Sequence, residues 1–459
     1  MTSSRAPMGR APADRFSAVV VGGGWSGIAA AWYLAASGAR VTLLDENTSL
    51  GGRCANALLG ERAVTLGGKN IGRGYTHFRE FTRALGFEDY EHFGINSSQV
   101  RDGRLHTVDS TARRHSAREL LGVLTARDAL RLLRLAWAVR RDEADGYLGG
   151  PAFRRLAARL DDPPLSGYFG PRTAARLVRP VTVRMNGAEP DEAHLGNFGS
   201  NLRMLMDTFD QLSGGFAALY EELARRLDVR LSTRVTALTT DASGRVDGVL
   251  AARPGEEPEH RPADAVVVAL PAPAAAPLVE PLHDRLAGEL RAVRYFPAAV
   301  AVVEYERPVF PERVRALVFD AGSPVSNAGA YGTGDRHIVR YTFSGRAARR
   351  RLADGATADD LVAAAEHGLA PHFPAVRDNR RVHTVTRRWD AAYCAYGRHH
   401  ARRLDRVGAA VASLPGLVLT GDYVRGASIE ACFRAARERT AALTAPPAGR
   451  ARPSTPARR

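Results

Sequence analysis

Lysine and cysteine are both scarce in this chain of 459 residues. Of its 64 basic residues, Lys69 is the only lysine and the rest are arginine. The three cysteines, Cys54, Cys394 and Cys432, are too far apart for a metal-binding motif. So few thiols are typical of a protein without structural disulfides in a reducing compartment. The sequence therefore predicts no metal site and a cytoplasmic location.

Long apolar runs are also missing. No segment has the roughly 20 apolar residues that a membrane-spanning helix needs. Residues 1–15 contain arginine, proline and serine but no apolar core, so we do not expect a signal peptide there. Hydrophobic residues make up 45% of the chain, which is ordinary for a globular protein with two or three domains.

Acidic residues are fewer than basic ones, 49 against 64, and the net charge is +15. Such a charge can indicate nucleic acid, an anionic membrane or an acidic ligand. No nucleic-acid motif is present, and several arginines lie near the two ends of the chain. We therefore expect no nucleic-acid partner and favour a small-molecule substrate, either acidic or held on an acidic carrier protein. The oligomeric state stays open.

A glycine-rich turn lies between a short apolar run and a helix-forming segment. Ala18–Val21 is typical of a buried parallel strand, and Gly22, Gly24 and Gly27 follow it as G-x-G-x-x-G. A second apolar run then ends in Asp45. In this arrangement the glycines allow a tight turn, close approach of a pyrophosphate and close helix packing, while the acid binds a ribose. The segment therefore predicts a dinucleotide site.

The residues after Asp45 indicate which dinucleotide. Gly51-Gly52-Arg53 follows the acid at a short distance. An acid followed by Gly-Gly-Arg resembles the flavin-dependent amine oxidase superfamily, which includes protoporphyrinogen oxidases and phytoene-type desaturases. The resemblance implies that Arg53 contacts the FAD pyrophosphate. It also implies an α/β fold, with a Rossmann-like FAD-binding domain and a mixed α+β substrate domain built from inserts.

A second motif near the other end of the chain strengthens the resemblance. Leu417–Thr420 is followed by Gly421-Asp422, and a helix is expected to start near Ser428. The family uses such a Gly-Asp pair to hold FAD, and the helix N-terminus faces the flavin ring. The resemblance thus implies non-covalent FAD bound by Gly22, Gly24, Trp25, Ser26, Gly27, Asp45, Glu46, Gly52, Arg53, Gly67, Gly68, Val235, Trp389, Gly421, Asp422, Ser428 and Ile429.

Candidate catalytic residues come from two segments. In the family, a Gly-Gly turn such as Gly67-Gly68 lies beside the flavin, so Lys69 and Asn70 are expected to face the active site. Tyr396 follows the segment of Trp389 and is expected to line the pocket, although core packing is an equal alternative. Cys394 lacks the spacing of a covalent flavin link, so a buried structural cysteine is expected instead.

The resemblance also divides the chain into domains. We expect the FAD-binding domain at 16–106, 206–279 and 405–442, and the substrate domain at 107–205 and 280–404. Residues 1–15 and 443–459 are expected to be disordered tails. We predict a helix from Gln211 to Leu227 and one strand over Val229–Val235. The basic helices of 112–160 could lie on a membrane, but a solvated arginine face is favoured.

The expected activity is oxidation of a C–N or C–C bond in a small or carrier-held metabolite, by hydride transfer to flavin N5. Three alternatives stay open at this point: a desaturase of isoprenoids or carotenoids, a non-redox flavin mutase, and a non-enzymatic binding protein of the same fold. The Gly-Gly-Arg and Gly-Asp motifs argue against the last.

Overall fold

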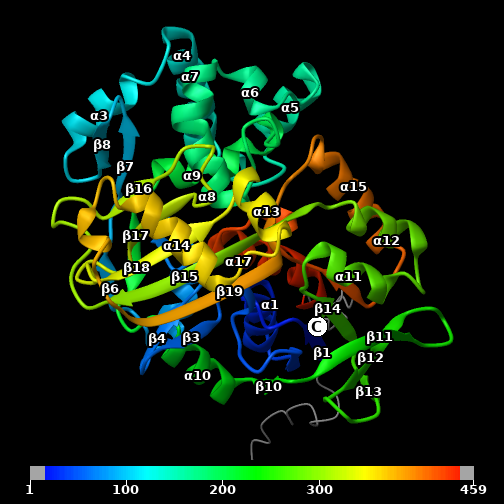
Figure 1. The fold of residues 1–459 in the computed structure, drawn as a ribbon. Coiled ribbons are helices and arrows are strands. Elements are labelled where there is room, and N and C mark those ends of the chain that lie inside the picture. The colour runs from blue at the N-terminus through cyan, green and yellow to red at the C-terminus, as the bar shows by residue number, and fades with distance from the viewer. Residues whose placement is uncertain (1–15, 445–459) are drawn as a thin grey trace, which may run out of the picture.

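The computed structural model describes residues 16–444 (Figure 1). The predicted tail 1–15 lies outside the described residues, as does the second tail from residue 445. Helix α17 spans Ile429–Thr444, so the chain is still helical where the second tail was expected to begin, at 443. The last helix therefore continues two residues beyond the predicted limit.

A five-stranded parallel sheet organises one half of the molecule. Its strands are β1 (Ser17–Val21), β2 (Arg40–Leu44), β10 (Asp228–Arg230), β14 (Ala265–Val268) and β20 (Leu417–Leu419), in the order β10-β2-β1-β14-β20. Central strands covered on both faces require continuous apolar runs, and β14 is buried at every residue. The predicted Rossmann-like α/β architecture is confirmed.

Apolar layers cover both faces of this sheet. One layer contains α1 (Trp25–Ala36), α2 (Thr76–Ala84), α10 (Ala217–Arg226) and α17. The other contains α11 (Ala272–Val279), α12 (Asp284–Arg291), α15 (His400–Val411) and the antiparallel strands β11 (Arg234–Thr240), β12 (Val246–Ala252) and β13 (Glu259–Pro262). The side chains of alternate β1 residues pack into opposite layers, so this strand contributes to both hydrophobic cores.

The single strand predicted over Val229–Val235 is wrong. The chain leaves the parallel sheet after β10 and enters the three-stranded sheet at β11. At the break Ser232 has φ 50°, in the left-handed region. The amides of Ser232 and Thr233 donate to the carbonyls of Asn47 and Asp45, at 2.9 and 2.8 Å. These bonds replace the strand pairing and turn the chain across the end of β2.

A seven-stranded mixed sheet organises the other half. Its order is β19 (Arg381–Cys394), β15 (Tyr295–Tyr305), β18 (Ile338–Phe343), β17 (Asn327–Ala330), β16 (Ala316–Val318), β7 (Asn96–Arg101) and β8 (Arg104–Asp109). Helices α13 (Arg346–Ala353) and α14 (Ala358–Leu369) cover one face (Figure 1). The β7–β8 hairpin turns at Asp102-Gly103 and pairs within this sheet, although residues up to 106 were assigned to the FAD-binding domain. The domain limits as a whole stay a prediction.

Short strands connect the two halves. They are β3 (Asn56–Leu59), β4 (Arg62–Thr65), β5 (Ile71–Gly72), β6 (Tyr90–His92) and β9 (Phe209–Leu212). Gln211 lies in β9, and the helix that we expected from Gln211 begins at Ala217. The strand forms here because β9 pairs with both β5 and β6.

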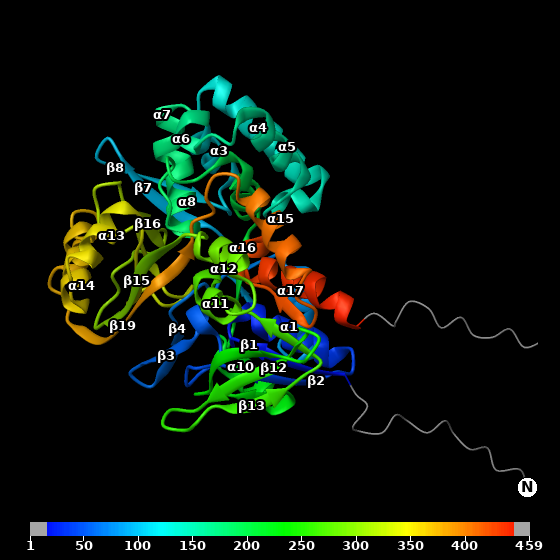
Figure 2. The same cartoon turned by 90° about the vertical axis from the view of Figure 1, so that its right-hand side faces the viewer.

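A helical segment lies at the top of the molecule (Figure 2). It contains α3 (Arg113–Leu121), α4 (Ala126–Arg141), α5 (Pro151–Leu160), α6 (Leu165–Tyr168), α7 (Pro171–Thr173), a π-helical turn at Ala174–Val178, α8 (Arg179–Asn186) and α9 (Phe198–Met206). On α4, Leu135 is buried while Leu133 and Trp137 are 67% and 60% exposed. Membrane association of this segment stays a prediction. Within residues 16–444, no helix combines the length and apolarity needed to cross a bilayer.

A buried carboxylate joins α17 to α2. Glu430 is fully buried, and its Oε1 accepts hydrogen bonds from the amides of Thr76 and His77, while its Oε2 accepts one from Phe78, all at 3.0 Å. These amides belong to the first turn of α2, where no intrahelical carbonyl is available. Glu430 therefore caps a helix that is distant in sequence and locks the two helices together.

We expect Glu430→Ala to lower the free energy of unfolding by about 3 kcal/mol or more, because three amides at the start of α2, one of them buried, lose a charged acceptor. Glu430→Gln keeps one carbonyl oxygen, so its free energy of unfolding should lie between those of the wild type and Glu430→Ala. Urea unfolding followed by circular dichroism measures the effect, with the exposed Glu257→Ala as control. An unchanged midpoint for Glu430→Ala would contradict the capping role.

Candidate active site

A cavity of about 1210 Å³ lies where the two halves meet. This is larger than the roughly 300–1,000 Å³ of common ligand sites, so it has room for a dinucleotide and a second molecule. Its lining brings together most of the predicted site residues: Gly22, Gly24, Trp25, Ser26, Asp45, Glu46, Gly52, Arg53, Gly67, Gly68, Lys69, Asn70, Val235, Trp389, Gly421, Asp422, Ser428 and Ile429. Gly27 and Tyr396 do not line it.

The three glycines of the first motif have different surroundings. Gly22 has φ +104°, which only glycine adopts freely. A Cβ on Gly27 would lie 1.8 Å from the carbonyl oxygen of Gly22, so α1 can pack against β1 only without a side chain there. A Cβ on Gly24 would meet no atom within 4 Å and would extend into open space at the cavity wall.

The N-terminus of α1 opens on the cavity without a cap. Gly24 is the N-cap residue, no side chain bonds to the first turn, and this turn carries no acid. Free amides and the positive end of the helix dipole make such a terminus a site for an anion. Nearby, Asp45 accepts hydrogen bonds from the amides of Gly23 and Asn47, so its carboxylate is fixed at the cavity edge.

The two motifs from opposite ends of the chain are in direct contact. Arg53 Nη1 donates to Asp422 Oδ2 at 2.7 Å and to the carbonyl oxygen of Ala392 at 2.9 Å. Tyr295 donates to the other carboxylate oxygen of Asp422 at 2.5 Å. Asp422 itself starts the short helix α16 (Asp422–Arg425) and is buried. The guanidinium is thus held at the cavity wall by a fixed acid.

The Gly67-Gly68 turn brings Lys69 to the cavity. A Cβ on Gly67 would lie 2.2 Å from the carbonyl oxygen of Arg53, so this close approach requires glycine. A Cβ on Gly68 would meet nothing within 4 Å. Lys69 and Asn70 follow, and both line the cavity as expected. Their catalytic roles stay predictions.

The direct contacts of the Lys69 amine are with neutral groups. Its Nζ donates to Gln211 Oε1 at 3.0 Å and to the backbone oxygen of Tyr331, and it lies 3.5 Å from the centre of the Tyr331 ring. Gln211 also donates to Asn70 Oδ1 at 2.8 Å and so joins the two predicted residues. Burial, reinforced by the charge of Arg340, lowers the pKa of Lys69 to about 7. The amine is therefore poised to exchange a proton near neutral pH.

The prediction for Tyr396 is wrong. Its side chain is buried in the apolar core outside the cavity, with the ring centre 5.3 Å from that of His400. Its hydroxyl donates to the backbone oxygen of Asp422 at 3.0 Å. Tyr396 therefore supports the Asp422 backbone and does not face a substrate. Cys394 is also fully buried and does not line the cavity.

Several cavity residues were not identified from the sequence. Gln211 was expected in a helix, and its bonds to Lys69 and Asn70 cross about 140 positions of the chain. Arg340 carried a visible signal, because it interrupts the apolar strand Ile338–Phe343. Arg184 carried no such signal, because arginines are frequent throughout the neighbouring helices.

Known proteins similar to this chain share its fold. Residues 25–444 match the model of the flavin containing amine oxidoreductase family. The chain belongs to this family. Among solved structures, a triple mutant of putrescine oxidase with a redesigned cofactor site matches at TM-score 0.72 and 16% identity, over 94% of this chain and 98% of that one. Cyclohexylamine oxidase from Brevibacterium oxydans IH-35A matches at TM-score 0.69 and 20% identity, over 94% and 99%.

This amine oxidoreductase is therefore an enzyme with a flavin cofactor, and its cavity suits one. The open space at Gly24 and the uncapped helix N-terminus accept an anionic group such as a pyrophosphate. Arg53 supplies a cation at the same wall, and Asp45 supplies an acceptor for ribose hydroxyls.

Two glycine variants of the amine oxidoreductase separate flavin binding from folding. We expect Gly24→Ala to fold normally but to bind flavin at least about tenfold more weakly, because the methyl group enters the space that a pyrophosphate would take. Gly27→Ala should instead lower thermal stability, because its Cβ overlaps the carbonyl oxygen of Gly22. The melting temperature measures the loss of stability in Gly27→Ala, and a flavin titration measures the loss of affinity in Gly24→Ala. Equal flavin affinity in wild type and Gly24→Ala would contradict this role.

Proposed function

We propose that this enzyme uses non-covalent FAD to oxidise a C–N or C–C bond of a small or carrier-held metabolite. The observation that carries the proposal is the continuity of one cavity from the uncapped end of α1, past Arg53, to Lys69. The part of the cavity between α1 and Arg53 suits a dinucleotide. The part at Lys69 offers a side chain able to exchange a proton near neutral pH.

Bound FAD would accept a hydride, two electrons with one proton, from a substrate C–H bond. A second proton must leave the substrate when its C–N or C–C bond becomes a double bond. We assign the acceptance of this proton to the neutral amine of Lys69, whose nitrogen is oriented by Gln211 and Tyr331.

The cavity thiols support a non-covalent cofactor. Cys54 and Cys432 line the cavity, but burial raises the pKa of both, to about 12 for Cys432. A protonated thiol is a poor nucleophile. We therefore expect the purified protein to be yellow and to release FAD into the supernatant on acid precipitation. A colourless protein that binds no added FAD would contradict the proposal, and colour retained in the pellet would indicate a covalent link.

The substrates of the similar structures do not by themselves indicate the substrate of this enzyme. One of them is putrescine oxidase bound to putrescine, which is a diamine. An amine of that kind is cationic at neutral pH and needs an acidic or aromatic site. In the present cavity, Arg184 and Arg340 are cationic, and no ion pair involves either of them among residues 16–444. This contrast favours an acidic substrate.

We expect Lys69→Met to fold and keep FAD but to reduce the rate of flavin bleaching by substrate about 10²-fold or more, the size of a lost general base. Lys69→Arg should not restore the rate, because the guanidinium is wider and stays protonated. In the wild type the rate should rise with pH through about 7, as the neutral form of Lys69 accumulates.

Anaerobic stopped-flow measurements between pH 5 and 9 test this role. Both variants should lack the rise near pH 7. Wild-type rates in Lys69→Met, or the same pH profile, would remove Lys69 from the reaction. Turnover that requires prereduced flavin and gives no net oxidation would favour non-redox flavin chemistry instead.

A further inference from the structure

The cavity lining carries an excess of positive charge. Nine arginine or lysine side chains line it against five carboxylates. Four of these acids are paired: Asp422 with Arg53, Glu119 with Arg101, Glu46 with Arg234, and Asp390 with Arg388. Asp45 is occupied by backbone amides. The acids therefore do not neutralise the cations near Lys69.

Arg184 is the clearest unpaired cation. It lies on α8 and lines the cavity, and its guanidinium makes no hydrogen bond or ion pair within the described part of the chain. The neighbouring Tyr393 also lines the cavity, and its ring packs against Gly187 at the C-terminal end of α8. The surrounding cavity wall, and then the charge of Arg340, lower the pKa of Arg184, although the residue as a whole is exposed. Its guanidinium still stays charged, because free arginine titrates far above neutral pH.

Arg340 presents a second guanidinium at the same wall. Its two terminal nitrogens donate to the carbonyl oxygens of Gly67 and Leu66, at 2.7 and 2.9 Å. Its Nε is buried and has no partner. The charge thus lies next to the Gly67-Gly68 turn and Lys69, and no carboxylate pairs with it among residues 16–444.

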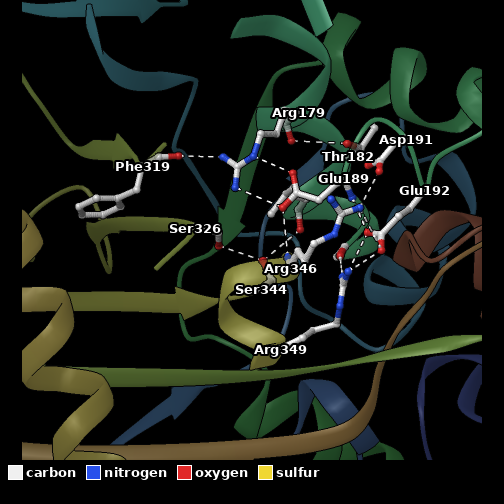
Figure 3. A network of polar contacts seen from close by, with 12 residues as sticks. Arg179, Thr182, Glu189, Asp191, Glu192, Phe319, Ser326, Ser344, Arg346 and Arg349 are labelled. Carbon is white, nitrogen blue, oxygen red and sulfur yellow. Dashed lines mark hydrogen bonds and ion pairs between the residues drawn. The ribbon is translucent and has the colours of Figure 1, made fainter. Parts of the chain in front are cut away.

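A polar network fixes the helix that carries Arg184 (Figure 3). Arg179, at the start of α8, is buried and donates to Glu189 Oε2 at 2.7 Å. Arg349 donates to the carbonyl oxygen of Gly187 at 2.7 Å, and Ser344 to that of Val183 at 3.0 Å. The helix is thus bonded to the loop at Glu189, to Ser344 after β18, and to α13. Arg184 is therefore presented by a rigid element, as a binding site requires.

The charges of Arg184 and Arg340 both reach the side chain of Tyr393, and both residues line the cavity without a carboxylate partner among residues 16–444. An anion that enters the cavity can therefore pair with both guanidinium groups. We infer that Arg184 and Arg340 bind a carboxylate or phosphate of the substrate, with the Tyr393 hydroxyl as a further donor. The inference rests on the proposed function, because it names the substrate class of the same cavity. Bound there, the anion orients the rest of the substrate toward Lys69.

Charge-matched probes test the inference on the FAD-loaded protein. Benzoate, benzamide and benzylamine share one ring and differ in charge, while phenyl phosphate replaces the carboxylate by a phosphate. Binding is measured by isothermal titration calorimetry and by the shift of the flavin absorption spectrum. We expect benzoate or phenyl phosphate to bind at least about tenfold more tightly than benzamide, and benzylamine to bind most weakly. The tighter of the two anions identifies the substrate group.

Arg184→Met is the decisive variant, because the side chain has no protein partner to lose and the fold should persist. It should weaken binding of the preferred anion about tenfold or more and leave benzamide unchanged. Arg184→Lys should restore part of the affinity. Arg253→Met, on the exposed surface outside the cavity, removes the same charge and should have no effect.

Three outcomes would overturn the inference: equal binding of benzoate, phenyl phosphate and benzamide; tighter binding of benzylamine; or wild-type anion affinity in Arg184→Met. The flavin spectrum of each protein is recorded first. Failure to bind FAD would count against the proposed function, whereas a normal flavin spectrum without charge preference would count against the anion site alone.

Discussion

The carboxyl ends of the parallel strands impose the main constraint on this molecule. Because all five strands run in one direction, the loops that follow β1, β2, β14 and β20 meet at one edge of the sheet. The glycine turn, Asp45 and Asp422 are each placed at the cavity by that edge. The second sheet supplies the opposite wall. Cofactor groups and substrate groups are thus held by different sheets that share one cavity.

Charged side chains have different kinds of partner at the two ends of the cavity. Near the glycine turn, each charged side chain has a partner of opposite sign or a set of amides, as in the pair of Arg53 and Asp422. Near Lys69, the ammonium is held by an aromatic ring and an amide oxygen instead. Neutral partners leave its proton free to move, whereas a carboxylate would have fixed it.

The sequence was informative where the chemistry is local. Gly22, Gly24 and Gly27 lie within six positions, and their spacing was enough to predict the turn and the helix after it. The approach of Asp422 to Arg53 was foreseen only through the family resemblance. Gln211 could not be predicted, because its partners Lys69 and Asn70 lie far away in sequence and meet it through strand pairing.

Other failures have a similar cause. The side of a strand that faces a cavity depends on its neighbours, and Tyr396 faces the core instead. Val229–Val235 has the composition of one strand, but backbone bonds to residues 45 and 47 divide it. Arg184 resembles every other arginine of its region in sequence, and only its place in the cavity lining, without an ion pair among the described residues, sets it apart.

The contact between Arg53 and Asp422 has a consequence for biosynthesis. The two residues are 369 positions apart. At about 5–20 residues per second, a ribosome needs on the order of 20 to 70 s to add Asp422 after Arg53. During that time the first glycine turn is already made but lacks the strand and helix that complete its wall. The cofactor can therefore be enclosed only after nearly all of the described chain has been synthesised, and a nascent chain must protect an unfinished apolar sheet until then.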